Sequence, residues 1–176
     1  SQMTTGVQNT IVGGLAGDAI TEGSHNIAMG YGALTSLNTG ADNVAIGVNA
    51  GGALTTGSNN VAIGNYALDN EDAHGKNVAI GYAALTAQDA GADAYNVAIG
   101  YEAGKLISTG ANNVLVGYAG RALSTGGRNV AVGSLALNQE DAHGNNVAIG
   151  FYALQAQNAG ADAYNVAIGY DAGKTT

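Results

Sequence analysis

The chain has 176 residues, a formal net charge of −8 and 29 glycines, but no proline, cysteine or tryptophan and a single phenylalanine. Glycine at about 16 per cent, against ~7 per cent in average proteins, and the shortage of large aromatic residues exclude a conventional aromatic core. The absence of cysteine excludes disulfides and thiolate metal sites. The acidic balance disfavours nucleic acid as a partner, and no apolar run approaches the ~18 residues of a membrane span, so we expect no membrane insertion in this segment.

The pentamer Asn-Val-Ala-Ile-Gly, or a close variant, recurs ten times along the chain. Successive copies start 16 to 19 residues apart, and 17 is the commonest spacing. The copies begin at Asn9, Asn26, Asn43, Asn60, Asn77, Asn96, Asn113, Asn129, Asn146 and Asn165. Alternation within one copy puts Val44 and Ile46 on one face of a strand and Asn43 and Ala45 on the other. We expect Val and Ile to point inward and the asparagines to form a hydrogen-bonded ladder at a corner.

The repeat units are of two kinds, which differ in the residues after the pentamer. In one kind the pentamer is followed by Ala-Leu, as at Ala33-Leu34. In the other it is followed by Ala-Gly, and an apolar pair comes later, as at Ala53-Leu54. A unit of ~17 residues is long enough for two short strands and two turns, stacked in parallel on the next unit. The sequence therefore predicts an all-β fold, a parallel β-solenoid (β-roll) of about ten coils and roughly 45 to 50 Å in length, with residues 1–176 forming one repeat domain.

The third residue of the pentamer is alanine in eight copies. Because a single thin coil buries few large side chains, we expect this flat alanine column to face outward and to pack against other copies of the chain, in a homotrimer. The predicted oligomer interface consists of Ala45, Ala62, Ala79, Ala98, Ala131, Ala148 and Ala167.

An aromatic residue directly follows the pentamer in six copies. One interpretation is a strip that stacks on a glycan or contacts another receptor, and the other, which we favour, is packing between coils or subunits. The candidate contact residues are Tyr31, Tyr82, Tyr101, Tyr118 and Tyr170.

The segments 69–75 and 138–144 place His74 and His143 beside acidic residues, within a block duplication in which residues 60–104 recur as 129–173. A metal site is conceivable there, but neither segment has the ligand spacing of a known calcium loop, so we favour solvated turns and predict no metal and no cofactor. The loops 89–95 and 158–164 carry the two extra residues of the 19-residue units and are expected to decorate one face. No serine, cysteine, lysine or histidine stands apart from the repeat, so we predict no catalytic residues and no enzyme activity.

The pentamer, its following tyrosine and turns such as Thr55-Thr56-Gly57 resemble the repeats of phage tail fibres, and also the head repeats of trimeric autotransporter adhesins. The first resemblance implies a homotrimeric structural and adhesive segment of a virion tail fibre, serving host attachment. The second implies a bacterial cell-surface adhesin. A monomeric solenoid that binds ice or another flat surface is a further alternative. We expect the chain to be a piece of a longer fibre protein.

Overall fold

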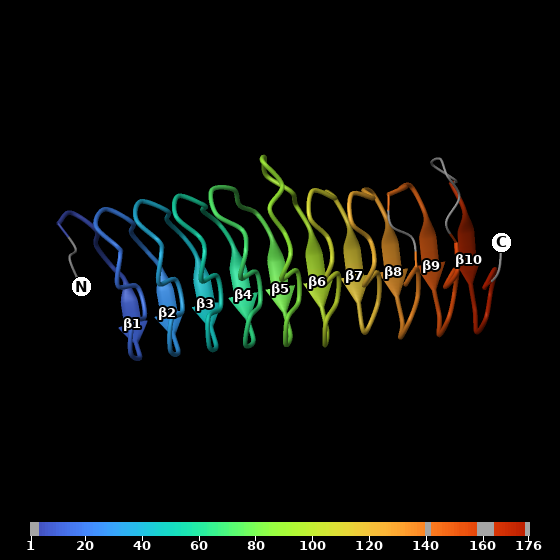
Figure 1. Ribbon diagram of the computed structural model, residues 1–176, viewed down its shortest axis with the longest axis horizontal. Coiled ribbons are helices and arrows are strands. Elements are labelled where there is room, and N and C mark those ends of the chain that lie inside the picture. Colours follow the sequence, from blue (N-terminus) through green and yellow to red (C-terminus); the bar gives the residue numbers. More distant parts are fainter. Residues whose placement is uncertain (1–3, 140–141, 158–163, 175–176) are drawn as a thin grey trace.

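The computed structural model describes residues 4–139, 142–157 and 164–174 and shows a rod made of stacked coils (Figure 1). Each coil contributes one three-residue strand, and the strands lie side by side in chain order in a single ten-stranded sheet. The strands are β1 (Thr10–Val12), β2 (Ile27–Met29), β3 (Val44–Ile46), β4 (Val61–Ile63), β5 (Val78–Ile80), β6 (Val97–Ile99), β7 (Val114–Val116), β8 (Val130–Val132), β9 (Val147–Ile149) and β10 (Val166–Ile168). The prediction of an all-β parallel solenoid is confirmed, and the described residues include no helix.

Neighbouring strands pair in parallel with equivalent residues in register. Val44, Ala45 and Ile46 of β3 lie opposite Val61, Ala62 and Ile63 of β4. The register survives the 19-residue unit between β5 and β6 and the 16-residue unit between β7 and β8. The length differences are therefore absorbed in the connections, and the sheet runs unbroken along the rod.

The strand faces are the reverse of the prediction. Asn43 and Ala45 are completely buried inside the coil, whereas Val44 is half-buried and Ile46 is exposed on the outside. The interior is narrow, and leucines from the opposite wall, such as Leu34 and Leu54, fill it. Only a small side chain fits beneath them at the strand, so the alanine points inward and the larger aliphatic residues point out.

The wall opposite the sheet is also not the second strand that we predicted. It is a series of turns in which some residues have a positive φ, in the left-handed region of backbone conformation. Leu34 has φ = 50°, and Gly51, at the same place in the next coil, has φ = 58°. These turns still bond from coil to coil, since the Leu34 N–H donates to the Ala50 carbonyl over 3.0 Å. The second wall is therefore hydrogen-bonded along the rod without being extended.

Interior volume is shared between facing positions. Where the third pentamer residue is large, a glycine faces it from the turn wall, six residues later for Ile11 and five later for Leu115, whose unit is one residue shorter. A Cβ added to Gly120 would lie 2.7 Å from Leu115 Cδ2, and one added to Gly17 would lie 2.9 Å from Ile11 Cδ1. In one kind of coil, a leucine at this turn position fills the core. In the other kind, a glycine there leaves room for a larger residue on the sheet or for a nearby leucine, so the core stays continuous.

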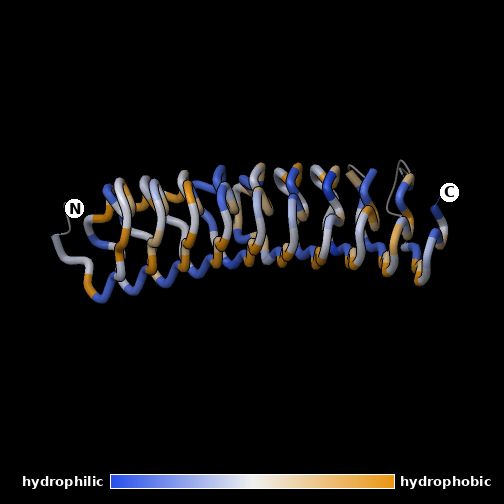
Figure 2. Tube along the Cα trace, turned by 90° about the horizontal axis from the view of Figure 1, so that it is seen from below, coloured by the Kyte–Doolittle hydropathy of each residue, from blue (hydrophilic) through white to orange (hydrophobic). Residues whose placement is uncertain are grey.

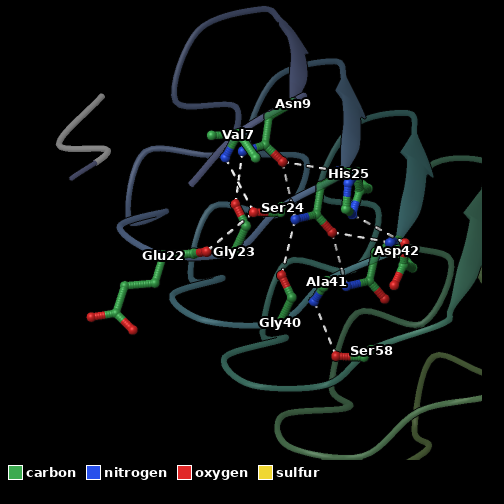
Figure 3. Close-up of polar contacts among 12 residues, drawn as sticks. Val7, Asn9, Glu22, Gly23, Ser24, His25, Gly40, Ala41, Asp42 and Ser58 are labelled. Carbon is green, nitrogen blue, oxygen red and sulfur yellow. Dashed lines mark hydrogen bonds and ion pairs between the residues drawn. The ribbon is translucent and has the colours of Figure 1, made fainter. Parts of the chain in front are cut away.

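The pentamer asparagines form a buried ladder along the rod. The Asn43 N–H donates to Asn26 Oδ1 over 3.0 Å, and Asn43 Oδ1 in turn accepts from the Asn60 N–H over 2.9 Å. Asn43 Nδ2 closes its own coil by donating to the Gly57 carbonyl over 2.8 Å. Figure 3 shows the N-terminal end of this ladder, where Asn9 Nδ2 donates to the Gly23 carbonyl. The predicted ladder is confirmed, but it lies inside the coil.

Candidate functional site

A double column of aliphatic side chains runs along the outer face of the sheet, and we call it the outer aliphatic row. It consists of the first and third residues of the strands, and hydrophobic residues recur from coil to coil along the rod in Figure 2. Exposed members include Met29, Ile46, Ile99, Val114 and Ile149, each between 37 and 39 % exposed. With the exception of Thr10, every residue of the row is Val, Ile or Met, so the row carries no charge.

The predicted alanine interface is wrong. Ala45, Ala62, Ala79, Ala98, Ala131 and Ala148 are at most 1 % exposed, and Ala167, in the last described coil, is 9 % exposed. These side chains are covered by their own chain, since they pack beneath the leucines of the turn wall. No second copy can reach them, and any contact between copies at this sheet must use the outer aliphatic row.

The predicted tyrosines stand beside this row, at the outer edge of each coil. Tyr31, Tyr82, Tyr101 and Tyr170 are exposed and Tyr118 is half-buried. Tyr82 and Tyr101 stack with ring centres 5.3 Å apart and planes 12° apart, and Tyr101 meets Tyr118 at 6.1 Å. Tyr170 stacks on Phe151 in the same way, so four of the five predicted tyrosines pack against an aromatic ring of a neighbouring coil. The geometry favours packing between coils, and receptor contact stays a prediction.

An ionic cluster lies next to Tyr101 and Tyr118. Glu102 is almost fully buried and accepts from Lys105 Nζ over 2.6 Å and from Arg121 Nε over 2.8 Å. The hydrogen bond from Lys105, helped by that from Arg121, outweighs burial and lowers the pKa of Glu102. The Arg121 guanidinium also lies 5.8 Å from the centre of the Tyr118 ring. This cluster ties two adjacent coils together across their outer edge.

The loop between β5 and β6 rises above the neighbouring coils (Figure 1) and folds back on the coil before it. Lys76 Nζ donates to Asp93 Oδ2 over 2.5 Å and to the Tyr95 hydroxyl over 3.1 Å, while the Gly75 N–H donates to Asp93 Oδ1. These contacts lower the pKa of Asp93 and raise that of Lys76. The equivalent loop 158–164 lies almost entirely outside the described residues.

Segment 69–75 is not the fully solvated turn that the sequence suggested. Glu71 is completely buried, and its side chain enters the core eleven residues after the pentamer asparagine. Burial raises the pKa of Glu71, and the charge of Asp89 acts in the same direction, while the N–H groups of His74 and Ala90 and the charge of His74 oppose the shift. The register could have revealed this position, because Ile20, Leu37 and Leu54 occupy it in the first three coils.

The duplicated segment 138–144 contains Glu140 and Asp141, which lie outside the described residues. His143 is half-buried. Among the described residues, one group of three possible metal-ligating side chains lies close together, formed by Glu71, Asp72 and His74.

A comparison with protein-family models, curated proteins and solved structures finds no match to this chain. Within the described part of the chain, no helix is long and apolar enough to cross a membrane. The fold therefore defines the chain as a tandem-repeat parallel β-solenoid, and its function must be argued from its surfaces.

Proposed function

We propose that this chain is a rigid segment of a homotrimeric surface fibre, most simply a virion tail fibre that mediates host-cell attachment. The observation that carries the proposal is the outer aliphatic row, which runs along the sheet from β1 to β10 with no charged residue in it. Long apolar surfaces of this kind mark protein contacts rather than free solvent-exposed faces. The resemblance of the repeats to tail-fibre repeats adds the setting, on a virion, and the partner, a host-surface glycan or protein.

A second copy of the chain is the partner that best fits the row. Its side chains recur with the ~4.8 Å spacing of parallel strands, so the same row on another copy offers matching ridges over the full length. Closed symmetry satisfies such rows without leaving an open end to polymerise. Three copies around one axis would shield all three rows while leaving the turns of each coil free on the outside.

The mass of the purified chain in solution tests this proposal. Light scattering after gel filtration is expected to give three times the 17.3 kDa chain mass at micromolar concentration. Ile63→Lys, which places a charge in the middle of the row, should dissociate the trimer, because a buried unpaired charge is costly. Thr56→Lys adds the same charge on an exposed turn and should leave the mass unchanged. A single-chain mass for the unaltered protein would refute the trimer.

A further inference from the structure

One column of the core changes from apolar to polar in the middle of the rod. The residue eleven positions after the pentamer asparagine is a fully buried Leu or Ile in the first three coils, but Glu71 in the fourth and Gln88 in the fifth. The Gln88 amide is satisfied: its Nε2 donates to the Ser108 carbonyl and its Oε1 accepts from Asn96 Nδ2 over 2.7 Å. Glu71 places a carboxyl group where the first coils have Leu or Ile, and one of its two oxygens, Oε2, makes no such hydrogen bond with the described residues.

The polar atoms around Glu71 are incompletely paired. Glu71 Oε1 accepts from the His74 N–H over 3.1 Å, and the Ala90 N–H lies near the carboxylate, but Oε2 is shielded from solvent and makes no hydrogen bond of normal geometry with the described residues. His74 Nδ1 is also shielded and makes no hydrogen bond within the described part of the chain. The two groups face each other, with 3.6 Å between His74 Nδ1 and Glu71 Oε1. A buried polar atom without a partner has given up its hydrogen bonds to water without replacement, so this arrangement calls for a missing partner.

We propose that Glu71, His74 and Asp72 bind a divalent transition-metal ion of the Zn²⁺ type. One possible ligand atom from each of the three residues lies within 4.8 Å of the other two. Two ligands on a tetrahedral Zn²⁺ ion are about 3.4 Å apart, close to the distance between His74 Nδ1 and Glu71 Oε1. One imidazole nitrogen and two carboxylates suit such an ion better than Ca²⁺, which takes six to eight oxygens.

The surroundings allow an ion to enter and favour its charge. Glu71 forms the buried floor of the site, the His74 side chain is 30 % exposed, and Asp72 lies at the surface, so the outer edge of the site borders on solvent. Asp72 is held by its backbone, whose carbonyl accepts from the Thr55 N–H, and its side chain is left to close over the ion. Asp89, in the next coil, adds negative charge near Glu71.

An alternative arrangement is an ion pair between a protonated His74 and Glu71 with no metal. That pair would satisfy neither atom by a hydrogen bond at 3.6 Å, and it would leave Glu71 Oε2 unpaired. The experiment below separates the two, because an ion pair gives no response to zinc.

Calorimetric titration of the tag-free, EDTA-dialysed protein with ZnCl₂ tests the site, with thermal unfolding as the second measurement. Zinc is expected to bind and to raise the melting temperature, since a ligand that binds only the folded state stabilises it. Glu71→Gln should fold, because Gln88 occupies the same column fully buried, and it should bind one zinc ion fewer per chain. His74→Gln should also bind one zinc ion fewer per chain. When Co²⁺ replaces zinc, the visible absorption band of the ion bound in the unaltered protein should be missing in His74→Gln.

A matched control exists in the regular coils. His25 Nδ1 lies 3.5 Å from Asp42 Oδ1, but both side chains are more than half exposed, so His25→Gln should leave the zinc stoichiometry and the melting response unchanged. The sequence Glu-Asp-Ala-His-Gly also occurs at 140–144, so the quantity to compare is the number of zinc ions per chain rather than the presence or absence of binding. No response to zinc, or an unchanged stoichiometry in both Glu71→Gln and His74→Gln, would overturn the proposal.

Discussion

The glycine that follows each strand from β1 to β9 lies close to the backbone of the next coil and has little room for a side chain. Gly47 has φ = 134°, and a Cβ added there would lie 2.6 Å from the backbone carbon of Gly64 in the next coil. Backbone cannot rotate away as a flexible side chain can, so a substitution must push two coils apart. Gly91 also has a positive φ, of 65°, but nothing lies within 4 Å of its added Cβ. Gly47 therefore combines a close contact with a φ that residues with a Cβ scarcely adopt, whereas Gly91 has only the milder penalty of the left-handed region.

We expect Gly91→Ala to cost about 1 kcal/mol, the usual penalty for a left-handed residue with a Cβ. Gly47→Ala should cost well over 3 kcal/mol, because it adds a clash with the neighbouring coil to an unfavourable φ. Thermal unfolding of both variants followed by circular dichroism measures the difference. Equal losses would mean that the coils are not as closely stacked at the glycine corner as the structure shows.

Glu102 makes stability depend on pH in a defined direction. Its pKa is lowered in the folded state, mainly by the hydrogen bond from Lys105, so the stabilisation is fully present above the unfolded value of about 4.3. It is lost as pH falls through the folded pKa. Glu102→Gln should lower the melting temperature at pH 7 by roughly 2–4 °C, the equivalent of about 1 kcal/mol for a bridge to two partly exposed partners.

The difference between the unaltered protein and Glu102→Gln should shrink as pH falls below about 4.3, where Glu102 becomes protonated in the unfolded chain, and should vanish once pH lies below the lowered pKa of folded Glu102. Glu22, an exposed carboxylate in a regular coil, provides the control. Glu22→Gln should follow the pH profile of the unaltered protein. A Glu102→Gln difference that stays constant from pH 7 to pH 3 would show that the loss comes from packing rather than from charge.

At the scale of the strand, the sequence predicted where each strand lies in the chain but not which of its faces points into the core. The ten pentamers became ten strands in the expected register, because Val and Ile favour extended chain and equal spacing favours parallel stacking. Alternation divides Ala45 from Val44 and Ile46 but does not say which set points inward. That choice depends on the volume left by the opposite wall, where residues such as Leu34 already fill the interior.

The turn wall was harder to predict because ordinary residues adopt unusual backbone conformations there. Leu68 and Leu85 have φ of 52° and 50°, values that side chains with a Cβ rarely adopt. The signal in the sequence is comparative: the same position is Gly51 or Gly104 in other coils, and glycine that alternates with leucine at one place indicates a positive φ. Each such leucine costs conformational energy, which its complete burial offsets.

The candidate metal site shows the same limit on prediction. Counting from Asn60 places Glu71 in the leucine column, so its burial could be read from the register. The approach of His74 Nδ1 to Glu71 could not, since it depends on how the turn after Glu71 closes. The charges of the segment suggested a solvated loop, but the position of Glu71 in the repeat decides its burial.

At the scale of the whole molecule, each coil contacts mainly the coils before and after it. Stability should then approximate a sum over coils and their interfaces, with no coil indispensable to the fold. Coils with leucine on the turn wall already stack directly on one another, as Leu68 and Leu85 do in the fourth and fifth coils. Removing the glycine-type coil between Leu34 and Leu68 would create the same kind of contact.

Deletion of residues 43–59, one complete unit, should therefore give a folded rod shorter by about 4.8 Å. Asn26 Oδ1, which now accepts from the Asn43 N–H, would accept from the Asn60 N–H instead, and Ile27 would face Val61. The outer aliphatic row would lose one rung in every copy, so a trimer should persist. Circular dichroism, small-angle scattering and light scattering test fold, length and mass. Deletion of residues 43–50 removes β3 but leaves half a coil behind, and should unfold the neighbouring coils; if both deletions behave alike, the 17-residue unit is not the unit of stability.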